Sequence, residues 1–380
     1  MLTPVDKPLP PYQLIATPEQ WQTCWQQLRQ APRLGLDLEA NSLYVYHENI
    51  CLIQISTPQQ DYIIDPLNLP DLSGLGQIVA DPAVEKVFHA AEYDLILMKR
   101  HYGWELNNLF DTMWAVRVLG HQQMGLAKLL QRYFQVSQDK KHQRANWCAR
   151  PLTRDQLAYA QIDSHFLLRL RDYLYDELQQ MDRLAEAQEI FVEHSRVKAP
   201  PIVFDPESFW QINGVRDLLP RQQAVLRELH LFRHEEAERR NHPLYRIISD
   251  RTTLELAQLL PESLEDLAQV YGMSPGQIGR YGRKLLHLIR EGKKAEPPRP
   301  PRRNERPPDD VMARFDQLHL WRKERAIRRG VESDVVVSKE ALWALAQARP
   351  RTWEALAQIN EIGPVRRQLY GEELLQLLNR

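Results

Sequence analysis

The second half of the chain repeats itself at a constant spacing of 89 residues. The segment LHLFR at 229–233 recurs as LHLWR at 318–322. The apolar residues of both stretches have helical spacing, so we predict two copies of one small all-helical domain, at 210–292 and 309–380. The same spacing, without any insertion, pairs Ala257 with Ala346, Pro261 with Pro350, Leu267 with Leu356, Pro275 with Pro364, Tyr281 with Tyr370, Gly282 with Gly371 and Leu285 with Leu374.

A basic, proline-rich segment at 293–308 separates the two copies. It contains six prolines, which disfavour both helix and sheet and favour an extended linker. From Arg280 to Arg306 there are ten Lys or Arg residues against three Glu, although the whole chain has a net charge of −1. The excess charge either keeps a solvated linker soluble or attracts phosphate groups between two binding modules.

The first 200 residues form a predicted domain in which strand and helix patterns alternate. The first three strand patterns are joined by short polar connections, which is typical of an antiparallel meander. The later strand patterns are each followed by a helical pattern, so the order predicts a mixed sheet of five to six strands with flanking helices. The predicted strands are 34–39, 51–57, 62–65, 86–89 and 109–111, and helical spacing covers 18–29 and most of 126–189.

The composition favours a soluble protein of two or three domains. The chain has 380 residues, of which 43% are apolar and 26% charged, as in ordinary globular proteins. No run approaches the roughly 18 to 20 apolar residues of a membrane span, and the first residues lack the pattern of a secretory signal. Cys24, Cys51 and Cys148 are far apart, odd in number and without metal-ligand spacing, so we expect a reducing, cytoplasmic location.

Two carboxylates end the first predicted strand of the meander. Asp37 and Glu39 lie two residues apart in the segment LGLDLE at 34–39, so they share one face of the strand with Gly35. Neighbouring acids in a buried strand repel each other and lose hydration, which is unfavourable unless a cation binds them. Their oxygen atoms suit Mg²⁺ or Mn²⁺. The alternative is an acidic triplet on a solvated turn.

Three further polar residues are candidates for the same site. Asp94 follows the strand at 86–89 and lies in the first turn of a predicted helix, where an acid also simply favours the helix dipole. Tyr159 and Asp163 lie one turn apart on a helix that Thr153 and Gln156 begin as a capping box. The alternative for this pair is a solvated helix face.

The four carboxylates and the phenol, in this order, resemble the DEDD exonuclease superfamily in its tyrosine-bearing branch. The histidine branch would have a histidine at position 158, where this chain has Ala158 followed by Tyr159. The segments 51–57, 62–66, 110–112 and 150–152 are similar to ribonuclease D and its eukaryotic exosome-associated relatives, and the repeated unit resembles the HRDC domain. The resemblance implies a ribonuclease H-like α/β domain followed by two HRDC domains. One departure is Ala40, where bacterial ribonuclease D proteins commonly have phenylalanine.

The resemblance also implies a mechanism with two divalent ions, Mg²⁺ or Mn²⁺. Asp37 would bridge both ions, and Glu39, Asp94 and Asp163 would complete their ligands. Ions about 3.5–4 Å apart would bind the attacking and leaving oxygens of an in-line displacement. Tyr159, whose pKa is ordinarily near 10, would orient the attacking water, and nucleoside 5′-monophosphates would leave from the 3′ end. We expect His89 and Asp111 to support the site structurally.

Two segments are candidates for substrate contacts. Lys141 and Gln143 precede Trp147 in a polar stretch that either reaches phosphates or is a solvated loop. Tyr44 and His47, which follow the strand that ends in Glu39, either stack on terminal bases or pack against the protein.

These features predict a 3′–5′ exoribonuclease that trims structured RNA, such as tRNA precursors with 3′ extensions, while the HRDC copies hold the body of the RNA. We expect a monomer without an obligate protein partner and without membrane contact. One alternative is a 3′–5′ DNA exonuclease, which the lack of a polymerase or helicase module disfavours. The other is a non-catalytic RNA-binding scaffold, which would not need the acids that this chain keeps.

Overall fold

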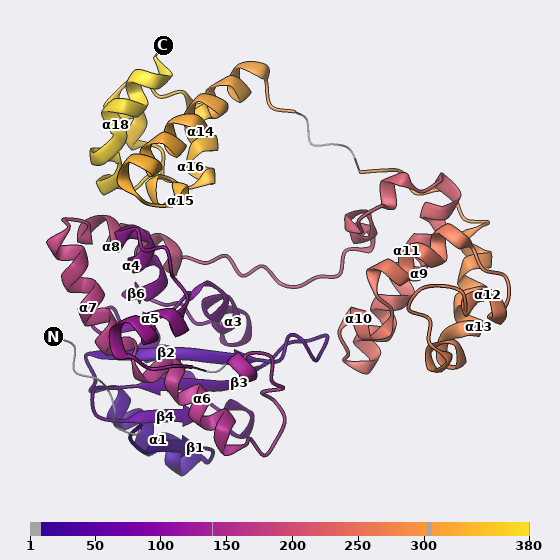
Figure 1. Ribbon diagram of the computed structural model, residues 1–380, viewed down its shortest axis with the longest axis horizontal. Helices are drawn as coiled ribbons and strands as arrows, with labels where there is room; N and C mark the ends of the chain where they lie inside the picture. The colour runs from indigo at the N-terminus through magenta and orange to yellow at the C-terminus, as the bar shows by residue number, and fades with distance from the viewer. Residues whose placement is uncertain (1–8, 139, 302–305, 380) are drawn as a thin grey trace. The chain divides into compact units, whose positions relative to one another are not determined.

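The computed structural model describes residues 9–138, 140–301 and 306–379 (Figure 1). The chain groups into two units. One contains residues 1–40, 50–200 and 306–380, and the other contains 41–49 and 201–305. Part of the predicted basic linker, 302–305, lies outside the described residues. Within the described ranges, no helix combines the length and the apolarity needed to cross a membrane.

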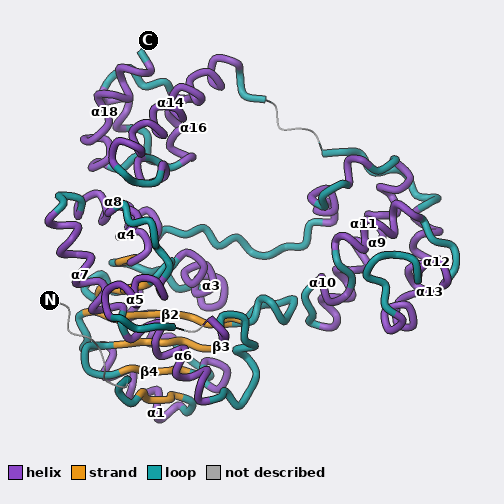
Figure 2. Tube along the Cα trace, in the orientation of Figure 1, coloured by secondary structure: helices purple, strands orange, loops and turns teal. Residues whose placement is uncertain are grey.

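The first unit is built on one six-stranded sheet with the strand order β1-β4-β3-β2-β5-β6 (Figure 2). Antiparallel pairing of β2 with β3 and of β3 with β4 confirms the predicted meander, and the remaining pairs are parallel, so the sheet is mixed. The sequence pattern did not reveal β1, because only its last residue, Ile15, is buried. The strands are β1 (Tyr12–Ile15), β2 (Arg33–Ala40), β3 (Ile50–Ser56), β4 (Asp61–Ile64), β5 (Glu85–Phe88) and β6 (Leu109–Asp111).

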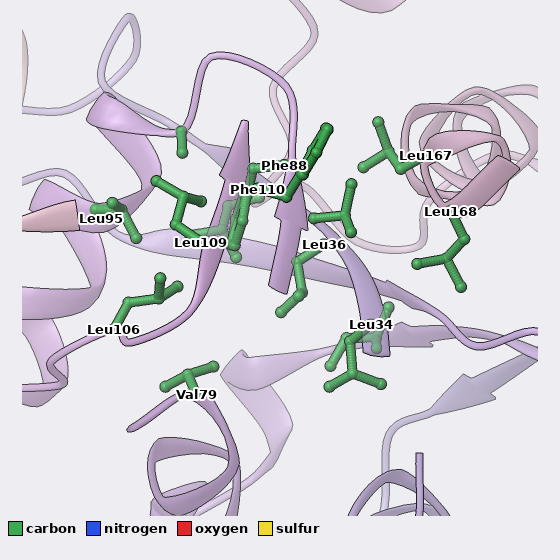
Figure 3. Close-up of a cluster of buried hydrophobic side chains, with 14 of the residues drawn as sticks. Leu34, Leu36, Val79, Phe88, Leu95, Leu106, Leu109, Phe110, Leu167 and Leu168 are labelled. Carbon is green, nitrogen blue, oxygen red and sulfur yellow. The ribbon is translucent and has the colours of Figure 1, made fainter. Parts of the chain in front are cut away.

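Helices cover both faces of this sheet. On one face, the alternating leucines of β2 join a hydrophobic core with side chains such as Val79 and Leu95 (Figure 3). On the other face, α6 and α7 pack on the sheet. The helices of this domain are α1 (Pro18–Leu28), α2 (Ser73–Ala80), α3 (Glu92–Tyr102), α4 (Thr112–Leu119), α5 (Leu126–Phe134), α6 (Arg154–His165), α7 (Leu167–Gln180) and α8 (Leu184–Ser195).

Gly35 lets the two helices approach β2 closely. A Cβ at this position would lie 2.9 Å from the backbone oxygen of Ser164 and 3.2 Å from Cβ of Leu167. Any larger side chain would therefore push α6 and α7 away from the sheet. Because Gly35 shares its face of β2 with Asp37 and Glu39, the same close contact brings α6 over the two carboxylates.

The helical repeat is confirmed at the level of individual helices. Every helix of the second copy begins 89 residues after its counterpart in the first, and each copy has its own hydrophobic core. The first copy consists of α9 (Pro220–Arg240), α10 (Leu244–Ile247), α11 (Asp250–Leu259), α12 (Leu264–Leu267) and α13 (Pro275–Gly292). The second consists of α14 (Asp309–Arg329), α15 (Ser333–Val336), α16 (Lys339–Ala348), α17 (Trp353–Ala357) and α18 (Pro364–Leu378).

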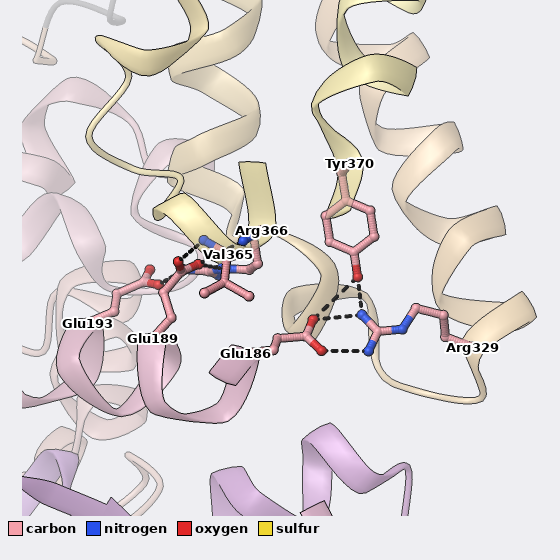
Figure 4. Close-up of polar contacts among 7 residues, drawn as sticks. All are labelled: Glu186, Glu189, Glu193, Arg329, Val365, Arg366 and Tyr370. Carbon is pink, nitrogen blue, oxygen red and sulfur yellow. Dashed lines mark hydrogen bonds and ion pairs between the residues drawn. The ribbon is translucent and has the colours of Figure 1, made fainter. Parts of the chain in front are cut away.

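The second copy is attached to α8 within the first unit (Figure 4). Glu186 forms a bidentate ion pair with Arg329, with distances of 2.7 and 2.6 Å. Glu189 accepts hydrogen bonds from Nε of Arg366 at 2.8 Å and from the backbone N–H of Val365 at 2.6 Å. Glu193 pairs with the same Arg366. We call Glu186, Glu189 and Glu193 the α8 acidic row.

Two of the three cysteines form a disulfide bond, Cys51–Cys148, with a Cα–Cα distance of 4.9 Å. Cys24 is free and buried. The sequence analysis predicted a reducing compartment because the cysteines are far apart in the sequence. The fold brings Cys51 and Cys148 together in a disulfide bond, so their spacing no longer supports that prediction. The meander places Cys51 at the start of β3, and the loop before α6 returns Cys148 to the same place, 97 residues later.

Candidate active site

The structure brings together three carboxylates from distant parts of the sequence. Asp37 and Glu39 at the end of β2 and Asp163 near the end of α6 each offer an oxygen atom, and these atoms all lie within 4.8 Å of one another. The strand periodicity puts the first two on one face, and the close approach at Gly35 puts α6 over that face. The three residues form the centre of the candidate site.

Helix α6 is fixed in register by hydrogen bonds at both of its ends. At its start, Thr153 and Gln156 form the predicted capping box, with distances of 3.2 and 3.0 Å. Near its end, the hydroxyl groups of Ser164 and Ser56 are 2.8 Å apart, which ties the helix to β3. Tyr159 and Asp163 are therefore held at defined positions over the sheet.

Asp94 contributes a fourth buried carboxylate from the first turn of α3. It is not part of the closest group of three, but it lies near enough to raise the pKa values of Asp37 and Glu39. The turn before α3 is held by Asp111, which accepts hydrogen bonds from the backbone N–H groups of Ala90 at 3.0 Å and Ala91 at 2.8 Å. Asp111 thus positions Asp94.

All four carboxylates have raised pKa values in the metal-free protein. Burial is the largest cause in every case, and repulsion among the carboxylates adds to it for Asp37, Glu39 and Asp94. The pKa of Asp163 is raised to about 7 by burial, although the hydrogen bond from Gln138 opposes the shift. The pKa of Glu39 is raised to about 9. The cluster therefore resists ionisation until positive charge compensates it.

A cavity of about 370 Å³ opens over this cluster. Tyr159 lines the cavity and accepts a hydrogen bond from Gln143, which lowers the pKa of the phenol. Burial and the nearby carboxylates outweigh this effect and raise the pKa above the ordinary value. Nε2 of Gln138 donates to Oδ1 of Asp163 at 2.5 Å. The other lining residues are Asp37, Leu38, Glu39, His89, Gly125, Leu126, Ala127, Lys128 and Asp163.

The sequence analysis missed three polar residues of this site. Gln138 lies in a loop where no periodicity marks it. Lys128, in the first turn of α5, carries no motif. Gln54 pairs with Asp37 in the β2–β3 register, and its buried amide has no hydrogen-bond partner among the described residues. The meander was predicted, so pairing its strands could have revealed Gln54.

The residues predicted to contact substrate separate into four groups. Gln143 lines the cavity, whereas Lys141 is exposed and is not one of the lining residues. Trp147 is a core residue, 1% exposed, whose ring centre lies 5.9 Å from that of Tyr159, so it supports Tyr159 and offers no surface to a ligand.

Tyr44 and His47 pack against the first helical copy, in the other unit. The guanidinium of Arg246 lies 5.5 Å from the ring centre of Tyr44, and the backbone N–H of His47 donates to Asn241 at 3.1 Å. For these two residues the structure favours the alternative of packing against the protein.

The donor set fits divalent metal ions. Carboxylate oxygens from three directions are the hard ligands that Mg²⁺ and Mn²⁺ prefer. Among the described lining residues of the cavity, Lys128 is the one cationic side chain. One ammonium group does not balance four buried carboxylates, so a site of this charge is suited to hold divalent cations.

The comparisons with known proteins agree with this geometry. Residues 12–179 match the model of a 3′–5′ exonuclease domain, and residues 222–289 and 311–378 each match the HRDC domain. The class of protein is therefore a 3′–5′ exonuclease with two HRDC domains.

Comparisons with individual relatives identify the family within this class. The chain is 32% identical to ribonuclease D of Acidiphilium cryptum over 374 residues, covering 96% of this chain and 92% of that protein. The crystal structure of Escherichia coli RNase D matches with a TM-score of 0.69 and 26% identity, covering 97% of this chain and 99% of the other. The exosome complex exonuclease of Saccharomyces cerevisiae is 28% identical over 73% of this chain and 40% of its own length. The chain belongs to the ribonuclease D family and is a hydrolytic 3′–5′ exoribonuclease.

Proposed function

We propose that the protein removes nucleotides from RNA 3′ ends at the Asp37, Glu39, Asp94 and Asp163 cluster, using two divalent cations, Mg²⁺ or Mn²⁺. The observation that carries the proposal is the convergence of three carboxylates within 4.8 Å, with a fourth close by, in a cavity open to ligands. When bound, the cations would supply the positive charge that acidifies a water and stabilises the departing 3′ oxygen.

The protein side chains have separate tasks in this reaction. The phenol of Tyr159 stays protonated at neutral pH, because its pKa is raised above the ordinary value, so it orients the attacking water by hydrogen bonding and does not deprotonate it. Gln143 holds that phenol, and Gln138 holds Asp163. Lys128 lies where it can bind a phosphate oxygen of the substrate. The expected products are nucleoside 5′-monophosphates.

We further propose that the substrates are structured RNAs with 3′ extensions, such as tRNA precursors, and that the protein acts as a monomer. The Escherichia coli relative is described as an exoribonuclease involved in structured RNA processing, and it matches nearly the whole length of this chain. The chain carries two helical domains in addition to the exonuclease domain, and these offer surface for an RNA body larger than the trimmed end.

The decisive experiment incubates the full chain with a tRNA that carries a 3′ extension, with a single-stranded DNA oligomer of matched length, and with each of Mg²⁺, Mn²⁺ and EDTA. We expect stepwise shortening of the RNA, release of 5′-monophosphates, and loss of activity in EDTA. Preferred shortening of the DNA would replace the RNA assignment by the DNA exonuclease alternative. Tight RNA binding without any shortening would favour the non-catalytic scaffold.

A further inference from the structure

The two helical copies keep the same internal contacts, so they can be compared position by position. In the first copy the rings of Phe232 and Tyr281 are 5.7 Å apart at 76°. In the second, their counterparts Trp321 and Tyr370 are 5.8 Å apart at 79°. An arginine lies over each tyrosine at nearly the same distance: Arg240 over Tyr281 at 5.7 Å and Arg329 over Tyr370 at 5.8 Å. Residues that differ between the two copies at matched positions of this shared framework therefore reflect different tasks of the copies.

In the second copy, this face is occupied by the α8 acidic row. Glu186 binds Arg329 and accepts a hydrogen bond from the hydroxyl of Tyr370 at 3.3 Å (Figure 4). Glu189 occupies the N-terminus of α18 so closely that a Cβ on Gly363 would lie 2.1 Å from its carboxyl carbon. The second copy thus uses its anion-binding groups to hold another part of the same chain.

In the first copy, the corresponding arginine is neutralised within its own helix. Arg240 pairs with Glu236, which also accepts hydrogen bonds from Arg239 at 2.9 Å. At the start of α13, Ser274 caps the helix by accepting from the backbone N–H of Gln277. Ser274 corresponds to Gly363 of the second copy, so the first copy caps this helix with its own side chain at the position where Glu189 of α8 meets the second copy. The first copy needs no acidic helix to complete it.

Two basic positions of the last helix in the first copy are acidic in the second. Arg283 and Lys284 on α13 correspond to Glu372 and Glu373 on α18, and Arg280 corresponds to Leu369. Arg280, Arg283, Lys284 and Arg290 are all exposed, and their spacing places the first three on one face of α13. The basic face continues along the chain into the Lys- and Arg-rich linker.

We infer that the two copies have different tasks: the second is a structural domain fixed by the α8 acidic row, and the first binds the phosphate backbone of RNA on the basic face of α13, at Arg280, Arg283 and Lys284. Three cations exposed on one helix face can contact successive phosphates of one strand, a contact without sequence preference. This inference rests on the proposed function, because it names the surface that holds the body of the substrate.

The test compares two triple variants that remove equal charge from the two copies. One is Arg280→Gln/Arg283→Gln/Lys284→Gln. The matched control is Lys323→Gln/Arg328→Gln/Lys339→Gln, whose three side chains are exposed in the second copy. Both are made in an Asp37→Asn background, and binding of a tRNA with a 3′ extension is measured by fluorescence anisotropy at several KCl concentrations. Circular dichroism checks that both variants are folded.

We expect the α13 variant to bind the tRNA roughly tenfold more weakly, and its plot of log affinity against log salt to be shallower by about 2, while the control stays close to the parent. Unchanged binding by the α13 variant, or equal weakening in both variants, would overturn the inference.

Failure of the proposed function would look different. A wild-type protein that binds tRNA through α13 but shortens no RNA would refute the catalytic proposal and leave the binding face in place. A protein that shortens RNA normally, but whose tRNA affinity is unaffected by the α13 changes, would refute the binding face and leave the catalytic proposal in place.

Discussion

The first unit contains two groups of carboxylates, most of them buried or half-buried, that differ in what compensates them. The α8 acidic row meets Arg329 and Arg366, with side chains of Glu189 and Arg366 only 9% and 3% exposed. The candidate active-site cluster has four acids and, among the described lining residues, one lysine. Buried acids paired with arginine stabilise a domain contact, whereas buried acids without such partners are suited to bind external cations. The comparison teaches that pairing, and not burial alone, separates a structural acid from a functional one.

The largest predicted effect is the loss of activity when the unpaired cluster loses a charge. Asp163→Asn should lower turnover at least a thousandfold, or about 4 kcal/mol in transition-state free energy, because it removes one of the proposed metal ligands. Single-turnover hydrolysis of a 3′-extended tRNA measures it. The matched control is Asp155→Asn, an exposed acid in the first turn of the same helix, which should keep normal turnover. Near-normal activity of Asp163→Asn would refute the assignment.

Breaking an arginine-paired acid should have the opposite signature. Arg366→Gln removes the guanidinium that pairs with Glu189 and Glu193, whereas the backbone N–H of Val365 still donates to Glu189. The change should lower the stability of the first unit by about 3 kcal/mol, while a folded sample in mild conditions still hydrolyses RNA. Denaturant unfolding measures the loss. Arg328→Gln, an exposed arginine of the same copy, is the control and should change stability by less than about 0.5 kcal/mol.

A double-mutant cycle sharpens this result. Glu189→Gln combined with Arg366→Gln should cost less than the sum of the single changes, because the second change removes a charge that the first left unpaired. Additive losses would show that Glu189 and Arg366 are not coupled. The distinction between the α8 acidic row and the candidate active-site cluster would then lose its support.

Tyr159→Phe should lower turnover about a hundredfold, because the attacking water loses its orienting hydrogen bond. Burial and the nearby carboxylates raise the pKa of this phenol, so it stays neutral and adds no negative charge to the site, and Mn²⁺ affinity measured by calorimetry should stay near the wild-type value. A matched loss of metal affinity and turnover would instead make Tyr159 part of the metal site. Tyr133→Phe, at a tyrosine bonded to Glu177, is a control outside the cavity.

Much of this site was predictable, because local patterns determine it. Strand periodicity placed Asp37 and Glu39 on one face, and the capping box at Thr153 set the helix that carries Tyr159 and Asp163. The mixed sheet and the helical repeat were predicted for the same reason. Their convergence was inferred from a family resemblance, since no local pattern states which helix crosses which strand.

The parts that the sequence did not reveal depend on tertiary contacts. The Cys51–Cys148 bond joins residues 97 positions apart in the sequence. Trp147 is buried because its loop packs against residues of β3 such as Cys51 and Leu52. Tyr44 and His47 follow the strand that carries Asp37 and Glu39, yet their contacts are with the first helical copy. The role of Glu189 was equally hidden, because an acid in a helix looks solvated until its partner is known.

The carboxylates of the candidate active site should also make stability depend on pH. In the metal-free protein, Asp163 and Glu39 have folded pKa values of about 7 and about 9, above their ordinary values near 4. The native state therefore holds protons that the unfolded chain releases, so stability should fall as pH rises from about 5 to 9, by up to about 1.4 kcal/mol per proton and pH unit. Thermal unfolding in EDTA measures the slope.

Saturating Mg²⁺ should remove this decline, because the cations replace the protons. Asp163→Asn should make the slope in EDTA shallower. A slope that is the same in the wild-type and variant proteins would show that the cluster does not titrate as the geometry requires.

The smallest predicted effect concerns Lys128, the cation that shares the cavity with the unpaired acids. If Lys128 served to neutralise the cluster, as Arg366 neutralises Glu189, then Lys128→Gln would lower stability in EDTA. We expect instead that stability stays the same and that KM for RNA rises roughly fivefold, since the side chain is exposed at the start of α5 and one phosphate contact is worth about 1 kcal/mol. Steady-state kinetics at fixed Mg²⁺ tests this, with Lys323→Gln as the charge-matched control. A fall in stability without a change in KM would show that Lys128 neutralises the carboxylate cluster and does not bind the substrate.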